Sequence, residues 1–143
     1  MNTYRTIQTV TYETAANAIA VAIERAERLG VRAVATVVDA SLVPVAFGKA
    51  DGAPSHSVET SRRKAMTSAS TRKASATIPA DLAVALEHGS GGLLTSIGGG
   101  LPIAFDGVHV AGLGIAGGSP QQDVEIAVAT LTAIGADEVD VKK

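Results

Sequence analysis

Lys64 is the residue of this chain whose surroundings best suit chemistry. Four small or flexible residues, Ala-Met-Thr-Ser, follow it, and this placement predicts that its amine reaches into a cleft. An ammonium group there can bind a carboxylate or a phosphate. A desolvated amine can act as a base or form a Schiff base. Arg62 and Arg63 do not share its helical face, so we expect them to be solvated or paired with neighbouring subunits.

Three histidines are further candidates for proton transfer or ligation. His56 lies in a loop before a predicted helix and is the freest of them, so we interpret it as a second candidate catalytic residue. His88 ends a short predicted helix, where a cation suits the dipole and capping is the simpler role. Strand alternation places His109 on one face with Ala111 and Leu113, which favours a structural role.

Glycines and a helix start provide candidate ligand-binding groups. Glycine leaves the backbone free for unusual dihedral angles and close approach of a ligand. Before the last predicted helix, free N–H groups would favour an anion, although a tight turn with simple capping is the alternative. The candidate ligand-binding residues, beside Lys64, are Gly98, Gly99, Gly100, Gly117, Gly118, Ser119 and Gln122. The flanking pattern is neither a P-loop nor a dinucleotide fingerprint.

The remaining sequence predicts the elements that position these residues. A helix is predicted from the N-cap Thr11 to the terminator Gly30. Hairpins are predicted at 31–47 and, around the turn Asp106-Gly107, at 101–115. Pro44 predicts an edge strand or a bulge. Further helices are expected from about 55–57 to 75, from 79 to 89, and from the capping box at 119–122 to 134, followed by a mobile tail, 137–143.

These elements and the composition bound the fold. Two hairpins make an antiparallel sheet that helices must cover, which predicts one α+β domain over residues 1–143. Hydrophobic residues make up 46% of the chain, but it has only two Phe, two Tyr and no Trp. Such small side chains each bury little apolar area, so we expect a homo-oligomer.

Charge and residue usage exclude several functions. The net charge of −2 argues against general nucleic-acid binding. The absence of cysteine excludes disulfides, thiol nucleophiles and thiolate metal sites, and no metal site is predicted. We find neither an apolar run of membrane-spanning length nor a signal-peptide pattern, so we expect no membrane partner and a cytoplasmic location.

Three ordered segments resemble a known family. They are Val38–Phe47 with Asp51–Pro54, Lys64–Ser68, and Gly98–Ile103 leading into Gly112–Asp123. This set resembles the GlcG/HbpS-like family, which also includes the C-terminal domain of PduO, over roughly residues 8–135. The resemblance implies a profilin- or PAS-like layered fold with about five antiparallel strands, and assembly into dimers and often octamers.

The same resemblance implies possible ligands. Some members bind haem and some are described as haem-degrading, whereas others have no assigned role. Haem-binding members use a histidine near the first helix, and this chain has none before His56. Tyr12 could ligate iron in principle, but packing is its simpler role. Lys64 matches the lysine of the family pattern, and Asp39 and Asp123 also match; we interpret both aspartates as structural.

Two functional hypotheses follow. The leading one is a small-molecule-binding protein whose anionic ligand, haem being one such ligand, lies among Lys64, the Gly98–Gly100 loop and the helix start at 117–122. The alternative is a cofactor-independent isomerase, lyase or hydratase acting on a small oxygenated catabolic intermediate. Lys64 or His56 would then move the proton, and the helix start would hold an oxyanion. A structural or regulatory oligomer is a third possibility.

Overall fold

A four-stranded antiparallel sheet forms the centre of the molecule. The computed structural model describes residues 1–141, and its strand order is β2-β1-β4-β3. The strands are β1 (Val34–Asp39), β2 (Pro44–Lys49), β3 (Gly100–Phe105) and β4 (Val108–Ala116). The expectation of about five strands is therefore corrected to four in the described chain. Before the first helix the backbone makes one hydrogen bond to β4, from Val10 N–H to the Val110 carbonyl (3.1 Å), which is too little for a ladder.

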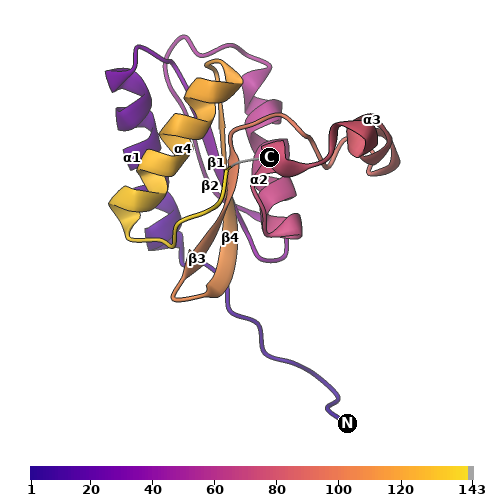
Figure 1. Cartoon of the computed structure of the whole chain (residues 1–143). Helices are drawn as coiled ribbons and strands as arrows, with labels where there is room; N and C mark the ends of the chain where they lie inside the picture. The colour runs from indigo at the N-terminus through magenta and orange to yellow at the C-terminus, as the bar shows by residue number, and fades with distance from the viewer. Residues whose placement is uncertain (142–143) are drawn as a thin grey trace.

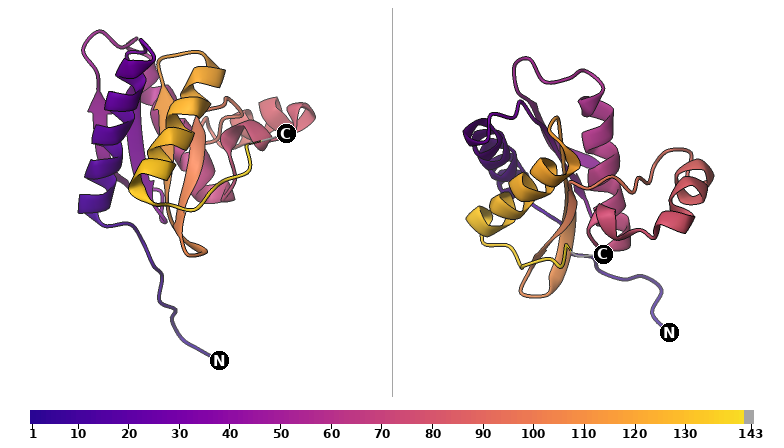
Figure 2. Two further views of the ribbon diagram at one scale, coloured as in Figure 1. Left: turned by 60° about the vertical axis from the view of Figure 1, so that its left-hand side comes forward. Right: turned by 45° about the horizontal axis from the view of Figure 1, so that its top comes forward.

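Helices cover both faces of this sheet. The helices are α1 (Tyr12–Arg28), α2 (Ser57–Thr71), α3 (Ala80–Gly89) and α4 (Pro120–Ile134), with a 3-10 turn at Ser75–Thr77. Figures 1 and 2 show α1 and α4 side by side on one face and α2 on the other. In the same views α3 projects away from these layers, and the first residues extend from the body.

The two faces of the sheet are packed differently. The larger core, between the sheet and α1 and α4, contains Ile19, Leu113 and Ile126, all buried. On the opposite face, Gly112 and Gly114 of β4 meet the backbone of α2 directly, and an added Cβ at either position would overlap it. Helix α2 consequently lies very close to β4, which brings its inward side chains to the end of that strand.

Most local signals in the sequence act as expected. Thr11 caps α1 by accepting a hydrogen bond from the Thr14 N–H (3.2 Å). Pro44 lies on an edge strand, opposite an irregularity between Val37 and Val38. Asp106 and Gly107 form the β3–β4 turn with φ of 52° and 79°, the positive values that such hairpin turns need. These predictions are confirmed.

The end of α2 and the state of the tail differ from the expectation. Helix α2 ends at Thr71 and not near residue 75, because Arg72 adopts a left-handed conformation (φ 60°). The tail is docked over its described part. Asp137 accepts hydrogen bonds from the N–H groups of Asp106 (3.0 Å) and Gly107 (2.7 Å), and Val139 packs against the core. Residues 142–143 of the predicted mobile tail lie outside the described residues.

Of the helices in residues 1–141, none combines the length and the apolar character that crossing a bilayer requires.

Candidate functional site

Lys64 projects from α2 towards the end of β4 and is almost fully buried, with 2% of its side chain exposed. Its Nζ donates hydrogen bonds to the Ile115 carbonyl (2.8 Å) and to Asp123 Oδ2 (2.9 Å). The close approach of α2 to the glycines of β4 places the amine there. The prediction that small neighbours let Lys64 reach inward agrees with this geometry.

Asp123 is the partner of Lys64 and comes from the other side of the sheet. It lies in the first turn of α4, its side chain is 3% exposed, and its Oδ1 accepts a hydrogen bond from the Gly118 N–H (2.9 Å). The pair therefore joins α2 and α4 past the end of β4. The sequence indicates only a structural role for Asp123 and does not reveal this contact, because 59 residues separate the partners.

The electrostatics of the pair combine burial with charge compensation. Burial lowers the pKa of the Lys64 ammonium, and the charge and hydrogen bond of Asp123 act in the opposite direction. A buried ammonium without a counter-charge would be strongly unfavourable. The carboxylate at 2.9 Å makes the unit neutral overall, so it does not act as a free positive charge.

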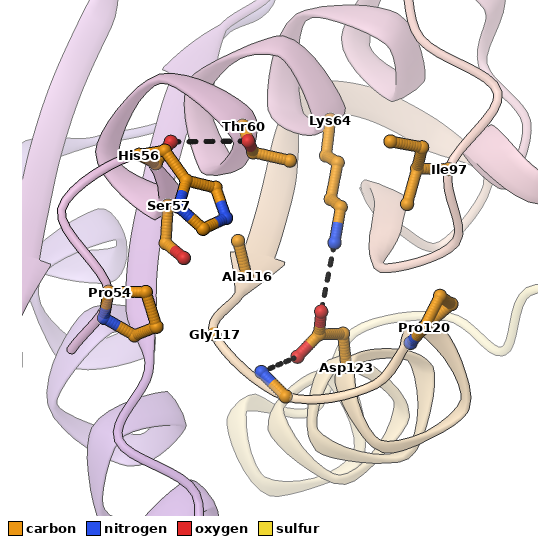
Figure 3. Close-up of a pocket in the computed structure, with 11 residues that line it drawn as sticks. Pro54, His56, Ser57, Thr60, Lys64, Ile97, Ala116, Gly117, Pro120 and Asp123 are labelled. Atoms are coloured by element: carbon orange, nitrogen blue, oxygen red, sulfur yellow. Dashed lines mark hydrogen bonds and ion pairs between the residues drawn. The ribbon is translucent and has the colours of Figure 1, made fainter.

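A cleft of about 410 Å³ opens onto this pair. Besides Lys64 and Asp123, the cleft is lined by Pro54, His56, Ser57, Thr60, Ile97 and Pro120, together with residues 116–118. Figure 3 draws Pro54, His56 and Ser57 on one side of the pair, and Ile97 and Pro120 on the other. The walls thus combine apolar surface with two hydroxyls and one imidazole.

His56 lines this cleft with Lys64, so the structure brings the two candidate catalytic residues together. It immediately precedes α2 and is exposed, and its carbonyl accepts a hydrogen bond from the Thr60 hydroxyl (3.2 Å). Of the three histidines, all of which lie within the described residues 1–141, His56 alone lines the cleft. His56 therefore occupies the rim, whereas Lys64 and Asp123 form the buried floor.

The glycines divide between the site and its supports. Gly117 and Gly118 line the cleft. Gly99 (φ +127°) lies behind the pair, where an added Cβ would be 2.9 Å from Lys64 Nζ and 2.5 Å from the Ile115 carbonyl oxygen. Gly100 packs against the Lys64 backbone, and Gly98 borders a separate hollow beside Val124. Ile97, which the sequence analysis did not select, lines the cleft in place of the Gly98–Gly100 loop.

The start of α4 uses its N–H groups within the chain. Ser119 and Gln122 form the predicted capping box, with reciprocal side-chain-to-backbone hydrogen bonds of 2.9 and 3.1 Å. The Gly118 N–H is bound by Asp123, whose own N–H donates to the Ser119 carbonyl (2.9 Å). These four donors are therefore engaged, and neither Ser119 nor Gln122 lines the cleft.

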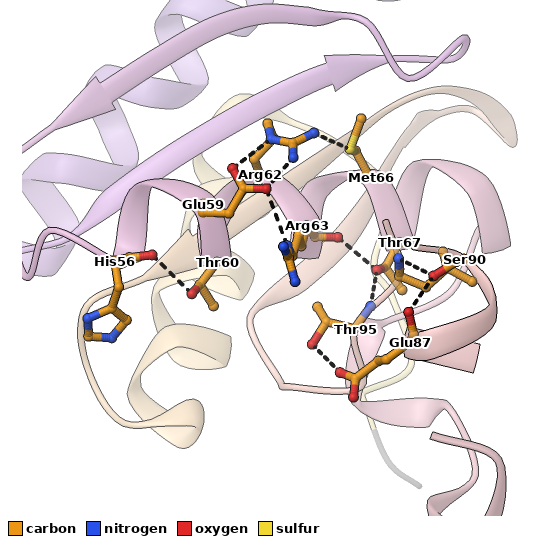
Figure 4. A network of polar contacts seen from close by, with 11 residues as sticks. His56, Glu59, Thr60, Arg62, Arg63, Met66, Thr67, Glu87, Ser90 and Thr95 are labelled. Carbon is orange, nitrogen blue, oxygen red and sulfur yellow. Dashed lines mark hydrogen bonds and ion pairs between the residues drawn. The ribbon is translucent and has the colours of Figure 1, made fainter. Parts of the chain in front are cut away.

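The other polar candidates lie apart from the cleft. Figure 4 shows Glu59 paired with Arg62 and Arg63 on the exposed side of α2, so the arginines have a partner within the chain. His88 is in the last turn of α3, and Tyr12 is 70% exposed. Within residues 1–141 no group of three or more acidic, histidine or cysteine side chains could hold a metal ion.

His109 corrects one prediction about strand faces. Its Nε2 lies 2.9 Å from the Ala69 carbonyl of α2, whereas Ala111 and Leu113 pack in the core on the opposite face. An irregularity in the β3–β4 pairing pairs His109 with Ala104 and Ala111 with Ile103, leaving Val110 as the extra residue. Burial lowers the pKa of His109. The contact with Ala69 agrees with the predicted structural role of His109, but the prediction that it shares a face with Ala111 and Leu113 is wrong.

The fold and the arrangement of the cleft define a small layered α+β domain of a known class. Residues 10–132 match the family described as haem degrading protein HbpS-like. The chain belongs to this family, which confirms the resemblance seen in the sequence.

Known relatives resemble the chain over most of its length. Over 118 residues it is 33% identical to the corrinoid adenosyltransferase PduO of Salmonella typhimurium, covering 79% of this chain but 35% of PduO. The chain thus spans about a third of that curated relative. A crystal structure of a PduOC:heme complex superposes with a TM-score of 0.84 at 28% identity, covering 92% and 99% of the two chains. The crystal structure of a double mutant of Streptomyces reticuli HbpS superposes with a TM-score of 0.83 at 29% sequence identity, covering 92% of this chain and 91% of that chain.

Proposed function

We propose that this protein binds a small molecule in the cleft above the Lys64–Asp123 pair, and that haem is the first ligand to test. The observation that carries the proposal is a cleft of about 410 Å³ with a buried ion pair as its floor. Membership of the HbpS-like family and similarity to a haem complex of PduOC support it. A pocket with apolar walls and a few convergent polar groups is the usual form of a ligand site.

The cleft offers haem one candidate iron ligand, an imidazole. His56 would hold the iron, and Pro54, Ile97 and Pro120 offer apolar surface to the macrocycle. Haem would supply an iron centre with a histidine ligand, as in globins and peroxidases. An acidic group of the ligand would meet the Ser57 hydroxyl or the remaining N–H of Lys64, because donors at the start of α4 are engaged.

Haemin titration followed by visible spectroscopy tests this proposal. We expect a saturable Soret band with a stoichiometry of one haem per subunit or per dimer, which His56→Ala weakens at least tenfold in affinity. His88→Ala is the matched control, because His88 lies on α3 outside the cleft, and it should bind as the wild type does. Equal binding by His56→Ala would refute the assigned ligand, and a featureless response would remove haem.

The ion pair also favours a second candidate, a cofactor-independent enzyme acting on a small oxygenated compound. Lys64 and Asp123 form a buried proton donor and acceptor 2.9 Å apart at the cleft floor. A buried lysine in a cleft, with its ammonium pKa lowered by desolvation and a carboxylate beside it, is a candidate for acid–base chemistry. Turnover of small hydroxy- or oxo-acids by the wild type, lost in Lys64→Met, would support it, and equal turnover in the variant would refute it.

We propose in addition that the protein self-associates, as a dimer to octamer. No residue of α3 is buried, and Leu82, Val84 and Leu86 of this helix are 49%, 78% and 37% exposed. Burying such side chains between copies would remove apolar area from water. Light scattering on the purified protein should give a mass of at least two chains, and a monomer at micromolar concentration would contradict this.

A further inference from the structure

We propose that Lys64 captures small aldehydes or ketones as an iminium adduct, with Asp123 as its proton partner. The inference rests on the proposed cleft as the ligand site and adds a covalent step to binding there. It follows from the chemistry of the groups that the cleft presents and from the position of the amine among the residues that line it.

The amine is the strongest nucleophile that the cleft offers once it loses a proton. The chain has no cysteine. Of the cleft hydroxyls, Thr60 is engaged with the His56 carbonyl, and an unactivated serine such as Ser57 is a weak nucleophile. A desolvated lysine is a recognised source of Schiff-base chemistry, and Lys64 is 2% exposed at the floor of an open cleft.

The proton has a place to go throughout the step. Asp123 Oδ2, 2.9 Å from Nζ, accepts a proton from the ammonium, and the freed lone pair attacks the carbonyl carbon. The protonated carboxyl returns that proton to the carbonyl oxygen, giving a carbinolamine. Asp123 then takes one of the two protons on the nitrogen and passes it to the hydroxyl, which leaves as water. The carbon–nitrogen double bond forms, and the nitrogen keeps its remaining proton.

Charge and atoms balance in this sequence. The ammonium and the carbonyl compound become the iminium and one water, with a charge of +1 on Lys64 before and after. Asp123 therefore faces a cation at both ends of the reaction, so the buried site never holds an unpaired charge at rest. A buried carboxylate that compensates both states would lower the cost of forming the adduct.

The surroundings set the class of carbonyl compound. Gly99 packs its backbone tightly behind the amine, where an added Cβ would lie 2.9 Å from Nζ, so a carbonyl compound has to reach the amine from the cleft. Pro54, Ile97 and Pro120 give short apolar walls, and Ser57 and Thr60 provide hydroxyls. The cleft volume of about 410 Å³ has room for a short-chain compound with a free aldehyde or keto group.

Reductive trapping on the wild-type protein tests the inference without a destabilised variant. The protein is incubated with propanal, or separately with pyruvate, and cyanoborohydride near pH 6.5, and adduct masses are mapped to individual lysines. Lys49 and Lys73 are internal controls because both are exposed. We expect Lys64 to be labelled faster than either control by at least one probe, since burial lowers the pKa of its ammonium and Asp123 Oδ2 lies 2.9 Å away to accept the proton.

Urea-unfolded protein provides the reference state. There the three lysines should be labelled at similar rates, and the preference for Lys64 should vanish. Labelling of Lys64 no faster than Lys49 and Lys73 in the folded protein, with both probes, would overturn the inference. Haemin binding that depends on His56 would survive that result, so failure of the covalent step is distinguishable from failure of the binding proposal.

Discussion

Asp123→Asn isolates the charge of the buried pair. Asparagine keeps the size of the side chain and an oxygen that can accept from the Gly118 N–H, but it leaves the Lys64 ammonium without a counter-charge. Removing one partner of a buried ion pair costs about 3–5 kcal/mol. With a urea m-value of about 2 kcal/mol/M for a small domain, the unfolding midpoint should fall by about 1.5–2.5 M.

The pH dependence of this variant supplies a second readout. Burial lowers the pKa of Lys64 in the folded state, so between that value and its unfolded value of about 10.4 the unfolded chain binds more protons. Stability therefore rises with pH across this window. Asp123 opposes the lowering. Its replacement by asparagine should start the window at a lower pH, so that stability begins to rise with pH earlier than in the wild type.

Urea unfolding followed by far-UV circular dichroism measures both effects. Glu59→Gln is the control, because Glu59 pairs with Arg62 and Arg63 but its side chain is 48% exposed. Exposed pairs contribute under about 1 kcal/mol. A loss in Asp123→Asn as small as that in Glu59→Gln, with an unchanged pH profile, would refute the reasoning that the pair is a compensated buried unit.

Three further predictions concern the scaffold. Gly114→Ala should lower the free energy of unfolding by at least about 4 kcal/mol or abolish folding, because the added Cβ would overlap the α2 backbone. The control is Gly89→Ala, where a Cβ meets nothing within 4 Å. In thermal unfolding, this variant should leave the melting temperature nearly unchanged. Asp137→Ala should lose about 1–3 kcal/mol in urea unfolding, since two N–H groups of the β3–β4 turn bind its carboxylate; no loss would show that the tail is undocked in solution. Ser119→Ala should cost about 1 kcal/mol by the same measurement, and a null result would contradict the assigned cap.

Local patterns predicted the elements well because their causes are local. The caps at Thr11 and Ser119 act through hydrogen bonds to residues three positions away. The Asp106–Gly107 turn follows from the φ angles that these two residues tolerate. Four strands could also be counted from two hairpins, whereas the expectation of five came from the family resemblance.

The site was only partly predictable, for a physical reason. Lys64 could be selected from its small neighbours, but Asp123 joins it only after α2 and α4 close over opposite faces of the sheet. One extra residue at Val110 turns His109 towards α2, and no periodic pattern reveals such a bulge. The glycines of β4 serve the packing of α2, a long-range role that their spacing alone does not distinguish from ligand approach.

Hydrogen–deuterium exchange with and without saturating haemin tests the location of the ligand most directly. We expect slower exchange in peptides covering 54–60 and 116–121, which border the cleft, and unchanged exchange in the exposed hollow around Lys49 and Gly52. In His56→Ala, haemin should not slow exchange in the peptides that border the cleft. Protection confined to another part of the chain, or no protection at all, would contradict the claim that the Lys64 cleft is the binding site.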